Sequence, residues 1–230
     1  MRYELKMVFP ESDYTVIVNR LISSRHAVRE IYHERQINNI YFDSLDYSDY
    51  RANTHGDSNR KKYRIRWYGD LRGEIASPTL ENKYKLGLSG GKKCMRLPSF
   101  RFDETFNYYN YTPKLCELMH CEAHNPDNMV MVSELLQRNP VLVNSYVRRY
   151  FLTGDKKYRI TLDKKLWFAN PTEAKLNCGH FGTYEQILVL EIKFDTSETA
   201  GASDLVNELG FRISKNSKYV NGVSSIMGLQ

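Results

Sequence analysis

The segment from Lys62 to Gly69 reads Lys-Tyr-Arg-Ile-Arg-Trp-Tyr-Gly and alternates strictly between cationic and apolar residues. In a β-strand this spacing would place Lys62, Arg64 and Arg66 on one face and the aromatic and aliphatic side chains on the other. A purely cationic face costs electrostatic self-repulsion, which a bound polyanion would relieve. Taken alone, the segment still favours the simpler interpretation, a solvated basic face on an ordinary sheet.

The same alternation recurs along the chain, with Glu residues interspersed among the cations. The ionisable residues that would share a strand face are Glu4 with Lys6, Glu81 with Lys83, Arg148, Lys157 with Arg159, and Glu191 with Lys193. Two architectures fit this pattern. One is a sandwich whose charged faces meet water, and the other is a closed barrel with a charged interior and an apolar exterior covered by helices.

A barrel interior lined with Arg and Lys suits a chain of phosphates. Arg offers planar bidentate donors to phosphate oxygens, and Lys offers a compact charge. A carboxylate that faces a polyphosphate is repelled unless a divalent cation lies between them. Because Mg²⁺ is typically held by one or two carboxylates plus phosphates, we expect Mg²⁺ or Mn²⁺, with Glu191 as the best ligand and Glu4 as the second.

Hydrophobic periodicity and helix-end signals predict the elements that would position these residues. Strands are predicted over 2–9, 28–32, 37–43, 60–69, 79–85, 141–152, 156–162, 166–168 and 187–195. Helices are predicted over 13–23, 45–54, 202–209 and, as a pair punctuated by Pro113 and Pro126, 112–138. The basic stretch 89–93 is predicted to be a flexible loop or a hairpin turn. Lys215 and Lys218 would share one face of a terminal helix.

The amino-acid composition is typical of a globular protein. The chain has 230 residues, 41% hydrophobic and 26% charged, and no Pro/Gly/Ser-rich linker divides it, so we expect one domain over 1–230. The net charge of +6 favours an anionic partner. No apolar run is long enough to span a bilayer and no signal peptide is present. We expect a cytoplasmic protein, attached to a membrane only through a partner protein that lies outside this chain.

The four cysteines, Cys94, Cys116, Cys121 and Cys178, are irregularly spaced, which indicates a reducing compartment. Cys116 and Cys121 lie near two histidines and suggest zinc. Their spacing matches no standard ligand pattern, so incidental placement on a helix is favoured.

The chain resembles the VTC-type polyphosphate polymerase domain, a member of the triphosphate tunnel metalloenzymes, together with the CYTH phosphatases and cyclases. The resemblance runs over most of the chain and is weakest at 97–138. It is carried by Lys6, Ile40-Tyr-Phe-Asp43, Arg64-Ile-Arg-Trp-Tyr-Gly69, Glu81-Asn-Lys83, Pro140-Val-Leu142 with Tyr146-Val-Arg148, Arg159-Ile-Thr-Leu-Asp163, Leu190-Glu-Ile-Lys193 and Lys215-Asn-Ser-Lys-Tyr219.

The resemblance implies an α+β fold whose eight antiparallel strands close into a tunnel, with helices packed outside. It implies transfer of the ATP γ-phosphate to a growing polyphosphate chain, with Mn²⁺ or Mg²⁺ held by Glu191. The residues that would do catalysis are Arg64, Arg66, Arg148, Arg159 and Glu191. Those that would bind phosphates are Lys6, Arg64, Arg66, Lys83, Arg148, Arg159, Lys193 and, near one mouth, Lys215 and Lys218.

One departure and three alternatives bear on this interpretation. Arg2 stands where the CYTH signature has its leading Glu, which argues against a two-metal hydrolase of that type. A tripolyphosphatase or nucleoside triphosphatase would use the same residues with water as acceptor. A non-catalytic binder of polyphosphate or RNA would need no metal; nucleic acid is not expected, because no RRM-like aromatic signature is present. A solvated sandwich would bind no triphosphate.

Overall fold

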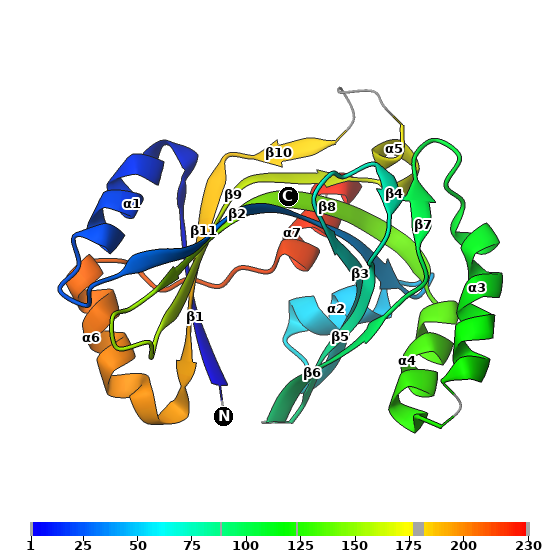
Figure 1. Cartoon of the computed structure of the whole chain (residues 1–230), viewed down its shortest axis with the longest axis horizontal. Coiled ribbons are helices and arrows are strands. Elements are labelled where there is room, and N and C mark those ends of the chain that lie inside the picture. The colour runs from blue at the N-terminus through cyan, green and yellow to red at the C-terminus, as the bar shows by residue number, and fades with distance from the viewer. Residues whose placement is uncertain (1, 88, 123, 177–181, 229–230) are drawn as a thin grey trace. The chain divides into compact units, whose positions relative to one another are not determined.

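The computed structural model describes residues 2–87, 89–122, 124–176 and 182–228, and so leaves Cys178 outside the described residues (Figure 1). The strands are β1 (Arg2–Pro10), β2 (Arg29–Asp43), β3 (Asn59–Tyr68), β4 (Gly73–Ile75), β5 (Thr79–Leu86), β6 (Ser89–Arg96), β7 (Phe100–Phe102), β8 (Asn139–Leu152), β9 (Arg159–Ala169), β10 (Thr183–Glu185) and β11 (Ile187–Asp195). The helices are α1 (Tyr14–Ile22), α2 (Ser48–His55), α3 (Tyr108–Cys121), α4 (Pro126–Leu136), α5 (Pro171–Ala174), α6 (Thr199–Leu209) and α7 (Lys218–Met227).

The chain forms two compact units that share the long strands β2, β8 and β9. Unit 1 comprises Met1–Gln36, Tyr146–Leu166 and Tyr184–Ser217, and unit 2 comprises Ile37–Ser145, Trp167–Thr183 and Lys218–Gln230. Each unit has its own hydrophobic core, so each is described by itself.

The main sheet has nine strands. The pairs β1–β11, β11–β9, β2–β3, β3–β5 and β5–β6 are antiparallel. Its hydrogen-bonded order is β1-β11-β9-β8-β2-β3-β5-β6, with β10 added to β9. Within the described residues, the end strands β1 and β6 do not pair. The predicted mixed α+β class with a large antiparallel sheet is therefore confirmed, whereas the predicted closed eight-stranded barrel is wrong.

In unit 1, α1 and α6 cover the apolar face of β1, β9 and β11. Alternation along β11 turns Leu190 and Ile192 toward the helices, where they pack with Ile17 of α1 and Leu205 of α6. The charged residues of the same strands therefore lie on the opposite face. Gly210 ends α6 in the left-handed conformation, with φ of 65°, as the sequence predicts for a helix stop at this position.

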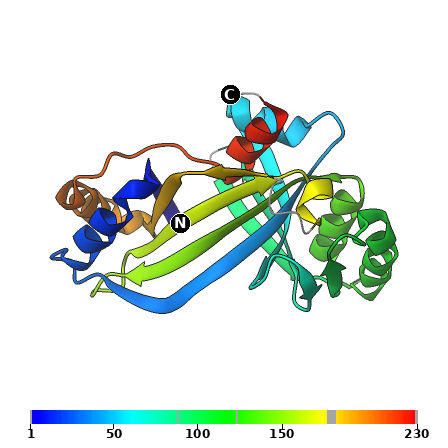
Figure 2. The ribbon, with the colours of Figure 1, turned by 90° about the horizontal axis from the view of Figure 1, so that it is seen from above.

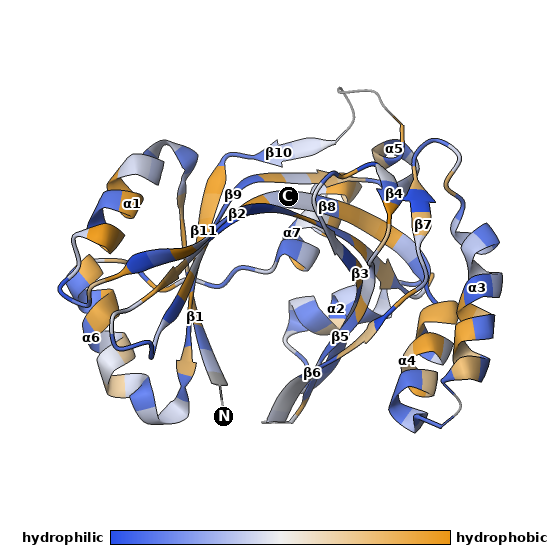
Figure 3. Ribbon diagram, viewed as in Figure 1, coloured by the Kyte–Doolittle hydropathy of each residue, from blue (hydrophilic) through white to orange (hydrophobic). Residues whose placement is uncertain are grey.

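In unit 2, the aromatic side of β3 packs against α3 and α4, which lie side by side (Figure 2). Tyr63, Ile65 and Trp67 are all at most 2% exposed and belong to this core. Apolar residues are mixed with polar ones around both helices, as expected for helices buried on one side only (Figure 3). Pro113 lies inside α3 rather than at its end, whereas Pro126 begins α4.

Asp43, at the end of β2, joins two further helices to unit 2. Its fully buried carboxylate accepts hydrogen bonds from the backbone N–H of Asp49 and Tyr50 in the first turn of α2 and from the hydroxyl of Tyr219 in α7. A Cβ at Gly222 would lie 2.5 Å from a ring carbon of Phe168, so only glycine lets α7 approach the strands this closely.

Several predicted boundaries need correction. The segments 28–32 and 37–43 form the single strand β2, and 159–169 forms the single strand β9, which continues through the left-handed Lys165. The stretch 89–93 is part of strand β6 rather than a loop. Lys157 was predicted to lie in the strand 156–162, but β9 begins only at Arg159. Lys215 lies outside any helix while Lys218 begins α7, so the predicted shared helix face is wrong.

Candidate functional site

A charged cluster lies on the sheet face of unit 1 opposite the core that contains α1 and α6, where β1, β11 and β9 pair. The antiparallel register places Lys6 opposite Glu191 and Glu4 opposite Lys193. The Lys6 Nζ lies 3.0 Å from Glu4 Oε1 and 3.3 Å from Glu191 Oε1. The Lys193 Nζ lies 2.8 Å from Glu191 Oε2 and 3.6 Å from Glu4 Oε2. The register therefore brings together four residues that the sequence predicts to be functional.

Arg148 joins this cluster from β8. It donates to both oxygens of Asp163, at 2.5 Å and 2.7 Å, and its Nη2 lies 3.7 Å from Glu191 Oε2. The Asp163 carboxylate is fully buried, so Arg148 is its charge partner and is held in one orientation. We call Glu4, Lys6, Arg148, Asp163, Glu191 and Lys193 the Glu191 cluster.

Electrostatics within the Glu191 cluster favour the charged forms of Lys6 and Arg148. Burial works to lower the pKa of Lys6, but the carboxylates of Glu191 and Glu4 outweigh it and the pKa is raised. Burial likewise opposes the charge on Arg148, and Asp163 outweighs it, so the pKa of Arg148 lies well above its usual range. With three cations facing three carboxylates, the cluster is charge-balanced.

The residues of the Glu191 cluster fit a divalent cation that is shared with phosphates. Within the described ranges, no three His, Cys, Asp or Glu side chains are grouped so that they could hold a metal ion by themselves. Glu191 and Glu4 can supply two carboxylates, and the buried hydroxyl of Thr161, opposite Glu191 on β9, has no hydrogen-bond partner. Such a hydroxyl can bind a phosphate oxygen or a metal-bound water, which agrees with the ligand habits of Mg²⁺.

A second cluster lies in unit 2 around Glu81, which is 5% exposed. Arg64 donates to Glu81 Oε2 through Nε at 2.8 Å and Nη2 at 2.5 Å, and Lys92 donates to Oε1 at 2.6 Å. The Arg66 Nη1 lies 3.6 Å from Oε2. Burial would raise the pKa of Glu81, but Arg64, Arg66 and Lys92 outweigh it and hold the pKa at about 2. These four residues form the Glu81 cluster, with three cations around one carboxylate.

Two residues of β2 that the sequence analysis gave no role position the arginines of the Glu81 cluster. The hydroxyl of Tyr41 accepts from Arg64 Nη1 at 3.0 Å, and Asn39 Oδ1 accepts from Arg66 Nε at 2.8 Å. Asn39 in turn donates to Asn144 at 2.8 Å. Asn39 and Tyr41 alternate along the strand that pairs with β3, and Tyr41 also lies in the segment Ile40-Tyr-Phe-Asp43 that carries the family resemblance.

A row of lysines extends this cationic face along β3, β5 and β6. Lys62 lies opposite Lys83, and Lys83 lies opposite Lys92. Like charges placed directly opposite one another destabilise a sheet, so a bound anion would stabilise this row. Lys93, the neighbour of Lys92, instead pairs with Asp127 at 2.7 Å. The register thus identifies which lysine of the basic stretch 89–93 joins the cluster.

The remaining predicted residues lie in unit 1 or at the start of α7. Arg159 is exposed and lies opposite Lys193 on β9. Lys215 is exposed in the irregular segment before α7, and Lys218 is half-buried as the first residue of that helix. The same irregular segment contacts the Glu191 cluster, because Lys6 Nζ donates to the carbonyl of Asn216 at 3.1 Å.

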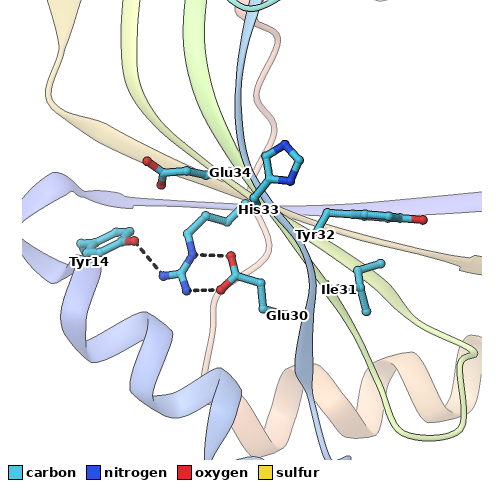
Figure 4. A pocket seen from close by; sticks show the side chains of 7 residues that line it. Tyr14, Glu30, Ile31, Tyr32, His33 and Glu34 are labelled. Atoms are coloured by element: carbon cyan, nitrogen blue, oxygen red, sulfur yellow. Dashed lines mark hydrogen bonds and ion pairs between the residues drawn. The ribbon is translucent and has the colours of Figure 1, made fainter.

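A surface hollow of about 540 Å³ in unit 1 is not an anion site. Its lining residues are Tyr14, Glu30, Ile31, Tyr32, His33, Glu34 and Arg149. The Arg149 guanidinium donates to both carboxylate oxygens of Glu30, at 2.8 Å and 2.6 Å, and to the Tyr14 hydroxyl at 2.7 Å. Figure 4 shows the Glu30 and Tyr14 side chains, with these hydrogen bonds as dashed lines. Because its charge is already neutralised, this hollow offers no cation to a phosphate.

None of the helices in the described part of the chain combines the length and the apolar character needed to cross a membrane.

Comparison with known proteins identifies a family and a fold. A family model described as VTC domain matches residues 1–227. A proposed adenylate cyclase from Bacillus halodurans has a TM-score of 0.53 and 13% identity over 94% of both chains. Another from Vibrio parahaemolyticus has a TM-score of 0.51 and 12% identity over 96% of this chain and 97% of that one. A protein from Pyrococcus horikoshii OT3 has a TM-score of 0.50 and 14% identity over 99% of each chain. At these identities the likeness is one of fold. No curated protein matches the chain by sequence.

Proposed function

The chain belongs to the VTC-domain family, and from this premise we propose that it is a metal-dependent polyphosphate polymerase. The reaction transfers the γ-phosphoryl group of ATP to the terminal phosphate of a polyphosphate chain. The observation that carries the proposal is the Glu191 cluster, in which Glu191 and Glu4 both lie within 3.6 Å of Lys6 and Lys193, and Glu191 also lies 3.7 Å from Arg148. A divalent cation shared with phosphates needs carboxylates for the metal ion and Lys or Arg side chains for the phosphates. A sheet face that only meets water would not be expected to bury a glutamate.

In this proposal Glu191 and Glu4 hold Mg²⁺ or Mn²⁺, and Lys6, Arg148, Arg159 and Lys193 bind the triphosphate. When bound, the ion would neutralise charge on the phosphate oxygens and withdraw electrons from phosphorus. The ammonium groups of Lys6 and Lys193 now contact the carboxylates. A divalent ion would compete with them for those oxygens, and the incoming phosphates would give both lysines new partners. Charge compensation of this kind couples metal binding to substrate binding.

The chain's own residues contribute positioning and charge stabilisation. Arg148 is held in place by Asp163, so its guanidinium is preorganised toward developing negative charge rather than having to be ordered during the reaction. The attacking oxygen of a polyphosphate end is already anionic, so the transfer needs no strong general base. Holding donor and acceptor phosphates in line supplies most of the remaining acceleration.

The Glu81 cluster of unit 2 contains three cations, Arg64, Arg66 and Lys92, and one carboxylate. We propose that Arg64, Arg66 and Lys83, with Lys92, bind phosphates of the polymer directly, without a metal ion. Lys215 of unit 1 and Lys218 of unit 2 are each proposed to bind phosphates as well. A polymer that must move by one phosphate per turnover is better held by a row of such cations than by one tight site, because the chain can exchange neighbouring partners.

The test is incubation with γ-labelled ATP and Mn²⁺, with the products resolved on a polyacrylamide gel. A ladder of labelled chains, lost in Glu191→Gln, is the expected result. Label that appears only as free phosphate would show that water is the acceptor, and the proposed activity would then be that of a triphosphatase of the same fold. Metal-independent binding of polyphosphate without either product would show a binding module and overturn the enzyme.

A further inference from the structure

A cluster of two tyrosines and one arginine lies in unit 1 outside the Glu191 cluster. The rings of Tyr32 and Tyr150 meet edge to face, with centroids 5.9 Å apart and an interplanar angle of 90°. The Arg35 guanidinium carbon lies 5.3 Å from the Tyr32 ring centroid and 5.7 Å from that of Tyr150. Tyr32 is 55% exposed and the other two are half-buried. We call these three residues the Tyr-Arg-Tyr cluster.

Tyr150 lies on the same face of β8 as Arg148. The intervening residue, Arg149, points to the opposite face, where it binds Glu30 and Tyr14. The residue after Tyr150, Phe151, is also on that opposite face, because it packs in the core with α1 and α6. Residues two apart on a strand share a face, so Tyr150 lies roughly 7 Å along the strand from Arg148.

Tyr32 completes the cluster from β2. In Figure 4 its ring points away from the Glu30 and Tyr14 side chains. The Arg35 guanidinium lies over both tyrosine rings, so two aromatic rings and one cation lie together, and the Tyr32 ring is the most exposed of the three side chains. Surface aromatic rings in contact with an arginine are the feature with which proteins stack nucleobases irrespective of sequence.

We propose that the Tyr-Arg-Tyr cluster binds the base of the substrate nucleotide. The inference rests on the proposed function, since it takes the triphosphate to lie on Arg148 and the rest of the Glu191 cluster. The separation of Tyr150 from Arg148 then leaves room for a ribose between the phosphates and the base. The site would make this chain prefer a nucleoside triphosphate over inorganic tripolyphosphate as phosphoryl donor. Because the contact is stacking, it would discriminate weakly among bases.

The experiment compares two ligands in the presence of Mn²⁺ by calorimetric titration: the β,γ-imido analogue of ATP and inorganic tripolyphosphate. Tyr150→Ala and Tyr32→Ala are expected to weaken the nucleotide analogue about tenfold each and tripolyphosphate about twofold or less. Tyr150→Phe should restore nucleotide affinity because it keeps the ring. Tyr184→Ala removes a tyrosine that is 67% exposed on β10 and is the matched control, with no change expected for either ligand.

The two ligands separate the inference from the proposed function. Equal losses for both ligands, no loss for the nucleotide, or equal affinities in the unaltered protein would overturn the base site while leaving the triphosphate site standing. Binding of neither ligand by the unaltered protein would overturn both.

Discussion

The Glu191 cluster of unit 1 and the Glu81 cluster of unit 2 are built alike around a buried glutamate with three cations, yet they differ in charge. Glu191 shares its cations with Glu4 and Asp163, so positive and negative groups balance. Glu81 contacts Arg64, Arg66 and Lys92, so within the Glu81 cluster as defined three cations face one carboxylate.

The difference indicates a division of labour. A balanced cluster can accept a divalent cation together with an anion, because the added charges offset each other. A cluster with excess positive charge attracts the anion directly and repels a metal ion. Glu81 then serves to align Arg64 and Arg66, and the positive charges of these arginines and of Lys92 lower the pKa of Glu81. The comparison makes distinct predictions for the two glutamates and their partners.

The largest expected effect is on stability at Arg148. Arg148→Ala should lower the free energy of unfolding by about 3–5 kcal/mol, because Asp163 would be left as a buried charge without its bidentate partner. Arg64→Ala should cost about 1–3 kcal/mol, since Glu81 keeps Lys92. Urea denaturation at neutral pH measures both. Equal losses of unfolding free energy in the two variants would mean that Asp163 and Glu81 do not differ in their dependence on one arginine. As a control, Asp163→Leu combined with Arg148→Met should recover most of the stability lost in Arg148→Ala.

The next effect is on metal dependence. Glu191→Gln should lower the rate of phosphoryl transfer about a hundred- to a thousandfold and raise the Mn²⁺ concentration needed for half-maximal rate. Glu81→Gln should leave that Mn²⁺ concentration unchanged and raise KM for the phosphate substrate, because its arginines lose their alignment. Mn²⁺ titrations of the transfer rate distinguish the two. A shift of the Mn²⁺ requirement in Glu81→Gln would contradict the assignment of metal binding to the Glu191 cluster and of direct phosphate binding to the Glu81 cluster.

A pH effect follows from the low pKa of Glu81. Its folded-state pKa of about 2 lies below the usual 4.5, so the stabilisation is fully present above pH 4.5 and is lost as the pH falls toward 2. The lost free energy should total about 3 kcal/mol. Unfolding free energies of the unaltered protein and of Glu81→Gln, followed from pH 6 downward, should therefore converge across that window. Parallel curves would contradict the prediction.

The smallest effect concerns the lysine row. Lys92→Ala should change stability by about 1 kcal/mol or less, because its side chain is 46% exposed, yet it should weaken polyphosphate binding about threefold in the absence of metal. Lys93→Ala is the matched control, since that neighbour lies on the other face of β6 and pairs with Asp127. The ratio of the two affinities, measured at low salt, is the readout, and a ratio near one would remove Lys92 from the site.

Much of the fold was predictable because strand alternation is a local property. The strand at β11 and the helix stop at Gly210 follow from periodicity and turn chemistry, and the resemblance to the VTC domain is confirmed by the family model. The segment 89–93 was mispredicted because its glycines and lysines resemble a loop, whereas pairing with β5 makes it a strand. Closure of the sheet was also mispredicted, since closure depends on contacts between strands that are distant in sequence.

The sequence by itself determined which residues share a strand face, since side chains alternate wherever a strand forms. It therefore predicted that Glu4 shares a strand face with Lys6, and Glu191 with Lys193. Only the tertiary structure decided which carboxylate meets which cation, that Asp163 holds Arg148, and that Asn39 and Tyr41 align the arginines of unit 2. The physical reason is register: a shift of one residue between paired strands changes every partner, and register is set by cross-strand packing and turns rather than by local composition.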